Sequence, residues 1–117
     1  SSPPRPVSST PSAPPAPRKL GILVSVEPAQ AGFQHALGLA AAGLDRGVDV
    51  YLYCIDDAVR GVSDPRLQAL KVRGLKLYAC AYGAQRRNIP LSDAAMFAGL
   101  TVVNDLIAST DRFVSFN

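Results

Sequence analysis

The chain has few of the residues from which metal sites and disulfide frameworks are built. It contains no tryptophan, one methionine, one histidine (His35) and two cysteines, Cys54 and Cys80. A structural zinc site takes four ligands, mostly Cys and His, and a disulfide-stabilised small protein needs a denser set of cysteines. We therefore expect no metal site, and two reduced thiols in a cytoplasmic protein.

Motifs that mark nucleotide sites, membrane helices and nucleic-acid surfaces are also absent from the sequence. The early loop at 27–32 lacks GxGxxG and the P-loop pattern, so a nucleotide or FMN site there is not supported. No apolar run approaches the ~18 residues of a membrane helix. From Leu20 onward, nine Lys/Arg balance nine Asp/Glu without a basic patch. Neither a membrane nor a nucleic acid is expected as a partner.

The first 18 residues differ in composition from the rest. Seven of the ten prolines lie within residues 1–17, together with several serines and no aromatic residue. Such a segment cannot bury enough apolar surface to offset the entropy of ordering it. It also lacks the continuous apolar region of a signal peptide. The composition predicts a disordered Pro/Ser-rich tail over 1–18 and one domain over 19–117.

Beyond the tail, apolar runs alternate with amphipathic stretches. Runs rich in β-branched residues predict buried strands, and apolar residues spaced three and four apart predict helices. The predicted strands are 20–26, 48–55, 75–80, a weak one at 94–99, and 112–116; the predicted helices are 29–46, 65–73, a short one at 84–88, and 101–109. This alternation indicates an α/β fold with an open, mostly parallel five-stranded sheet and helices on both faces, as in flavodoxin-like proteins.

Cys80 is the best candidate for chemistry. Sites in open α/β sheets lie beyond the carboxyl ends of the strands, and Cys80 stands where a strand ends and a helix begins. The free N–H groups of a helix N-terminus favour a thiolate, and Arg86 and Arg87 would add positive charge if the helix folds back over the loop. The thiolate is the nucleophile in sulfur exchange. The alternative is a small buried hydrophobic residue.

The run Cys80-Ala81-Tyr82-Gly83-Ala84-Gln85-Arg86-Arg87-Asn88-Ile89 resembles a segment of DsrE/DsrF-like proteins, including TusD-type subunits of sulfur relays. In that family a strand ends in one cysteine, and a short Ala-rich helix with Arg-Arg or Arg-Gly follows. Residues 19–26, 38–53 and 105–116 resemble other parts of the family in the same order. In this chain Asn88 stands where the family commonly has glycine, and the N-terminal tail is not a family feature.

The resemblance implies a sulfur-relay protein. Cys80 would accept sulfur as a persulfide from a donor protein and pass it to an acceptor protein, as a possible sulfurtransferase that needs no metal or organic cofactor. Arg86 and Arg87 would stabilise the thiolate, and Tyr82 and Gly83 would line its pocket. The family also implies a homo-oligomer, a trimer or hexamer, which suits so small a core.

Other readings of the sequence stay open beside this one. The chain could be a non-enzymatic interaction or assembly module of the same fold with a structural Cys80, or a small-molecule (nucleotide) binder at the strand-end crevice. Cys54 is expected to be a buried structural cysteine rather than a resolving thiol. His35 is expected on a surface or interface face of a helix. Asp56 and Asp57 are expected to cap a helical turn rather than to act as an acid/base pair.

Overall fold

The structure, a computed structural model, describes residues 19–90 and 92–117, with only the backbone of Leu100, Leu106 and Ile107. The predicted tail over 1–18 lies outside the described residues. The elements are β1 (Lys19–Val24), α1 (Ala31–Asp45), β2 (Asp49–Cys54), the 3-10 helix η2 (Asp56–Gly61), α2 (Pro65–Val72), β3 (Lys76–Cys80), α3 (Ala81–Arg86), β4 (Met96–Ala98), α4 (Leu100–Ser109) and β5 (Arg112–Phe116).

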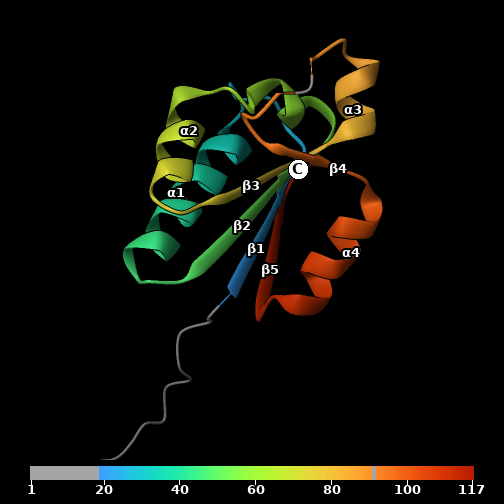
Figure 1. Cartoon of the computed structure of the whole chain (residues 1–117). Coiled ribbons are helices and arrows are strands. Elements are labelled where there is room, and N and C mark those ends of the chain that lie inside the picture. The colour runs from blue at the N-terminus through green and yellow to red at the C-terminus, as the bar shows by residue number, and fades with distance from the viewer. Residues whose placement is uncertain (1–18, 91) are drawn as a thin grey trace, which may run out of the picture.

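The described strands form a single sheet in the order β4-β3-β2-β1-β5, and every neighbouring pair is parallel. Helices α1 and α2 lie together on one side of the sheet, α4 lies on the other, and α3 lies beyond the carboxyl ends of the strands (Figure 1). The predicted open, parallel, five-stranded α/β sheet with helices on both faces is therefore confirmed. Strands β2 and β3 lie side by side, with Cys54 opposite Ala79, so the segments after both strands emerge next to each other.

The core sits between the sheet and α1. Alternate strand residues point to opposite faces, and Ile22, Val24, Val50 and Leu52 are almost fully buried on the face that α1 covers. Helix α1 contributes Phe33 at its first turn. This packing holds the strands in place, and the candidate site is built at their carboxyl ends.

Several predicted boundaries near that edge were wrong. Helix α3 follows Cys80 directly, as the predicted strand-to-helix junction at Cys80 requires, but it begins at Ala81 rather than at residue 84, because the Cys80 side chain itself acts as the N-cap. Strand β4 covers only Met96–Ala98 rather than 94–99, because only these residues pair with β3. The helix expected from residue 29 begins at Ala31, after a turn in which Gln30 donates its backbone N–H to Glu27 O at 3.0 Å.

None of the described helices has the length and apolar character needed to cross a bilayer.

Candidate functional site

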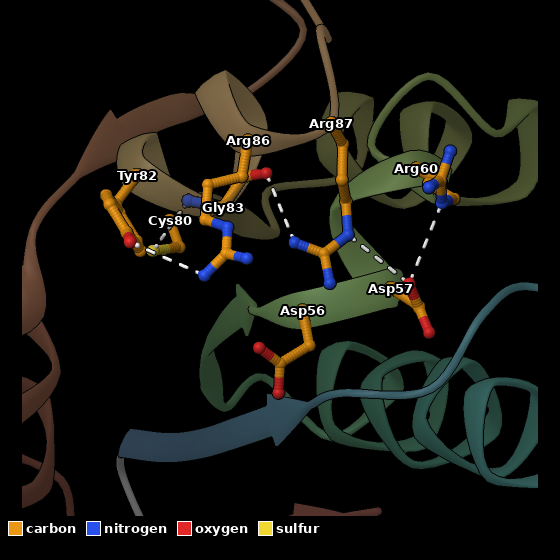
Figure 2. Close-up of a pocket in the computed structure, with 8 residues that line it drawn as sticks. All are labelled: Asp56, Asp57, Arg60, Cys80, Tyr82, Gly83, Arg86 and Arg87. Carbon is orange, nitrogen blue, oxygen red and sulfur yellow. Dashed lines mark hydrogen bonds and ion pairs between the residues drawn. The ribbon is translucent and has the colours of Figure 1, made fainter.

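Cys80 is both the last residue of β3 and the N-cap of α3. Its side chain is 8% exposed, and the backbone N–H of Gly83 donates a hydrogen bond to Sγ at 3.3 Å. The sulfur faces a pocket of about 370 Å³ at the carboxyl ends of β2 and β3 (Figure 2). The residues that line this pocket, called the thiol pocket below, are Asp56, Asp57, Arg60, Cys80, Tyr82, Gly83, Arg86 and Arg87.

Two pocket residues predicted from sequence, Tyr82 and Gly83, lie within one turn of the thiol. Tyr82 is 66% exposed, whereas Gly83 is buried. A Cβ at position 83 would lie 3.6 Å from the Cβ of Cys80 and 3.7 Å from Nη1 of Arg87. These are ordinary van der Waals distances, so the contribution of Gly83 to the site is its backbone N–H, which reaches the sulfur.

Arg86 and Arg87 both line the thiol pocket, but they use different partners. Arg86 Nη1 donates to the Tyr82 hydroxyl at 3.4 Å, and its guanidinium carbon lies 5.6 Å from the centre of the Tyr82 ring. Arg87 Nη1 donates to Gly83 O at 3.3 Å, and its Nε donates to Asp57 Oδ1 at 3.3 Å. In the described part of the chain neither guanidinium bonds to the sulfur. Stabilisation of the thiolate by their charge stays a prediction.

The expectation that Asp56 and Asp57 cap a helical turn was wrong. The N-cap of η2 is Ile55, and no side chain caps this helix. The Asp57 carboxylate instead pairs with Arg60 Nε at 3.7 Å and with Arg87 Nε at 3.3 Å. Asp56 adopts a φ of 50°, and its side chain lines the thiol pocket with no interaction drawn to it (Figure 2).

Sequence reasoning therefore missed Asp56, Asp57 and Arg60 as residues of the thiol pocket. Their position in the sequence could have identified them, because they directly follow the end of one strand, β2, and Cys80 lies at the end of the next, β3. The carboxyl ends of adjacent parallel strands meet at one edge of the sheet.

A buried tyrosine links β2 to β4, the two strands on either side of the strand that carries Cys80. Tyr53, on β2, is 0% exposed and its ring stacks on Tyr78 with 6.4 Å between centroids. Its hydroxyl donates to Ala98 O at 2.8 Å and to Gly99 O at 3.1 Å, which ties β2 to the end of β4. Burial raises the pKa of Tyr53 to about 12, and negative charge on the nearby Cys80 acts in the same direction.

The remaining cysteine and the histidine lie outside the thiol pocket. Cys54 is 0% exposed, as expected of a structural cysteine, and burial raises the pKa of its thiol to about 12. Both cysteines are free. His35 is exposed on α1, as expected. In the residues that the structure describes, no three His, Cys, Asp or Glu side chains gather as a metal site would require.

The protein is an α/β protein with an open parallel sheet and a cysteine thiol at the end of β3. The sequence profile of the DsrE/DsrF-like family matches residues 18–116. The chain belongs to this family, whose members are generally connected with sulfur relay. A search of curated proteins found no match.

Solved structures share the fold. The ychN protein of E. coli superposes with a TM-score of 0.74 at 20% identity, over 85% of this chain and 99% of that one. A conserved protein of unknown function from Bacteroides thetaiotaomicron, BT1422, gives a TM-score of 0.68 at 13% identity, over 85% of this chain and 95% of that one. At these identities the likeness concerns the fold alone.

Proposed function

We propose that the protein is a sulfur carrier in which Cys80 holds sulfane sulfur as a persulfide. The Cys80 thiolate attacks the outer sulfur of a persulfide on a donor protein. A bond forms between Sγ and that sulfur, the donor's S–S bond breaks, and the donor leaves as a thiolate with the electron pair. An acceptor thiolate then attacks the carried sulfur and releases Cys80 as a thiolate. The sequence of steps needs no oxidant, metal or organic cofactor.

The observation that carries this proposal is the position of the sulfur. Cys80 lines an open pocket, and the backbone N–H of Gly83 donates a hydrogen bond to its sulfur at 3.3 Å. A hydrogen bond from this N–H stabilises negative charge on Sγ, which Sγ bears as the attacking thiolate and again as the leaving group when the acceptor takes the sulfur. Cys54, by contrast, is fully buried and does not line the thiol pocket.

The proposal includes several features that the family implies. The donor and the acceptor are proteins, and the chain assembles with copies of itself as a trimer or hexamer in the cytoplasm. These features do not enter the test of the thiol, which uses an inorganic donor and can be carried out on the isolated chain.

The test is intact-protein mass spectrometry after incubation with inorganic polysulfide. The wild type and the Cys54→Ser variant should each gain the mass of about one sulfur atom, and dithiothreitol should remove it. Cys80→Ser should gain none while it unfolds at the same temperature as the wild type. Mixing the loaded protein with glutathione should then release glutathione persulfide and restore the original mass.

Two results would overturn the proposal. If the wild type gains no sulfur and its native thiol also fails to react with iodoacetamide, Cys80 is structural and an assembly module is the better reading. If sulfur loads equally on Cys80→Ser, the carrier is not this residue.

A further inference from the structure

The thiol pocket carries an unbalanced charge. Three guanidinium groups line it, against two carboxylates. The Asp57 carboxylate forms ion pairs with both Arg60 and Arg87. Among the described residues, Arg86 is the guanidinium of this pocket that has no carboxylate partner. One positive charge therefore stays uncompensated beside the thiol.

Arg86 is held in place without being neutralised. Its guanidinium lies over the Tyr82 ring at 5.6 Å and donates to the Tyr82 hydroxyl at 3.4 Å. Both side chains are exposed. Tyrosine and arginine are enriched where proteins bind one another, because a rigid ring and a planar fork lose little entropy on binding. A guanidinium fork fits a carboxylate through two parallel hydrogen bonds.

We propose that Arg86, positioned by Tyr82, binds a carboxylate that the partner protein carries next to its sulfur-bearing cysteine. This inference rests on the proposed function of Cys80 and names the chemistry that would recognise the partner. The η2 wall of the pocket carries Asp56, Asp57 and Arg60, so it holds one more carboxylate than guanidinium groups, whereas the α3 side carries Arg86 and Arg87 (Figure 2). A partner carboxylate is repelled there and attracted on the α3 side, so the charges also fix the direction in which the partner segment enters.

The experiment uses three short peptides that differ in one residue. Each has a cysteine activated as a 2-pyridyl mixed disulfide, and the residue beside it is Glu, Gln or Lys. The Cys80 thiolate attacks the peptide's cysteine sulfur, a new S–S bond forms, and pyridine-2-thiolate leaves with the electron pair and is measured by its absorbance. A Cys54→Ser background confines the reaction to Cys80, and 2,2′-dipyridyl disulfide gives the rate without any peptide.

The Glu peptide should react fastest and the Lys peptide slowest, about tenfold apart at low salt, and the difference should shrink at high salt. Arg86→Glu should reverse the order, so that the Lys peptide becomes the fastest. The matched control is Arg112→Glu, which makes the same change of charge on β5, outside the thiol pocket. That variant should keep the original order.

Failure of this inference differs from failure of the proposed function. Equal rates for the three peptides, or a reversal that Arg112→Glu produces as well, would overturn the carboxylate site while Cys80 still reacts with 2,2′-dipyridyl disulfide. A Cys80 that is inert toward that small disulfide would overturn the proposed function and the carboxylate site together.

Discussion

Asp57 and Arg87, 30 residues apart in the chain, are joined by a hydrogen bond of 3.3 Å that ties η2 to the end of α3. The same guanidinium donates to Gly83 O, and the N–H of Gly83 donates to Cys80 Sγ. The Arg87 side chain is only 21% exposed. Asp57 therefore acts on the position of the sulfur through Arg87 and the first turn of α3.

This relationship gives a prediction in which two effects of opposite sign compete. Loss of a carboxylate near a thiolate should speed alkylation of Cys80 through space, whereas loss of the anchor of Arg87 should slow it. We expect Asp57→Ala to react with iodoacetamide about threefold more slowly, a modest effect because exposed ion pairs are weak. Asp57→Asn keeps an acceptor and should stay near the wild-type rate. Faster alkylation of Asp57→Ala would show that the carboxylate acts by charge alone.

The two cysteines should differ sharply toward alkylating reagents. Cys54 is fully buried and its pKa is raised from 9.0 to about 12, so it stays a protonated thiol near neutral pH. Native protein treated with iodoacetamide at about pH 8 should gain one label, on Cys80, and protein unfolded in urea should gain two. Native Cys80→Ser should gain none. Mass spectrometry of the intact protein counts the labels, and a second label on the native wild type would contradict the structure.

The Tyr53 hydroxyl should stabilise the fold at neutral pH and lose this effect in alkali. Its pKa is raised from 10.0 to about 12, by burial and then by the charge on Cys80. Its contribution is therefore present below pH 10 and is lost as the pH rises through 12. Cys54, with its pKa raised in the same direction, loses its contribution from pH 9 upward, so both residues lower the free energy of unfolding in alkali.

The Tyr53→Phe variant separates the contribution of the hydroxyl. Without it, Ala98 O and Gly99 O lose their donor, and we expect a loss of about 1 kcal/mol in the free energy of unfolding at neutral pH. Urea titrations across the alkaline range should then give a shallower pH dependence for Tyr53→Phe than for the wild type. Identical slopes would mean that the hydroxyl ionises equally in the folded and unfolded chains.

Two glycines should respond to alanine in opposite ways. A Cβ at Gly61 would lie 2.6 Å from Pro28 Cγ and 2.8 Å from Cζ of the buried Phe33, so Gly61→Ala should lose about 1–3 kcal/mol through overpacking. A Cβ at Gly38, within α1, meets nothing within 4 Å, and Gly38→Ala should gain about 0.5–1 kcal/mol. Urea unfolding of both variants measures the difference, and a stable Gly61→Ala would contradict the close packing of η2 on α1.

The sheet could be predicted from the sequence because its buried strands are short apolar runs bounded by turn residues. The predicted strand at 112–116 coincides with β5, and the predicted strand at 75–80 differs from β3 by one residue. The predicted range 84–88 left out the first turn of α3, because capping rules favour Ser, Thr, Asp and Asn, and here the cap is Cys80. The ends of β4 depend on pairing with β3, which local composition does not reveal.

Five of the eight residues of the thiol pocket could be predicted from the sequence. Cys80, Tyr82, Gly83, Arg86 and Arg87 follow one another along a single segment, so their proximity is local. Asp56, Asp57 and Arg60 come from a segment 20 or more residues earlier and meet the thiol only because β2 pairs with β3. A general capping rule gave a sufficient local explanation for the two aspartates, and only the strand pairing corrects it.

The last strand of the sheet has a consequence for the order of folding. Strand β5 pairs with β1. At the amino ends of these two strands the backbone N–H of Lys19 donates to Asp111 Oδ2 at 2.9 Å, and the two residues are 92 positions apart in the chain. A contact between residues so distant closes a large loop and forms late, whereas β1, β2 and β3 meet through short connections. All residues that line the thiol pocket lie between Asp56 and Arg87. We therefore expect the site to assemble early, on a sheet that β5 completes afterwards, and pulsed hydrogen exchange should protect β3 before β5.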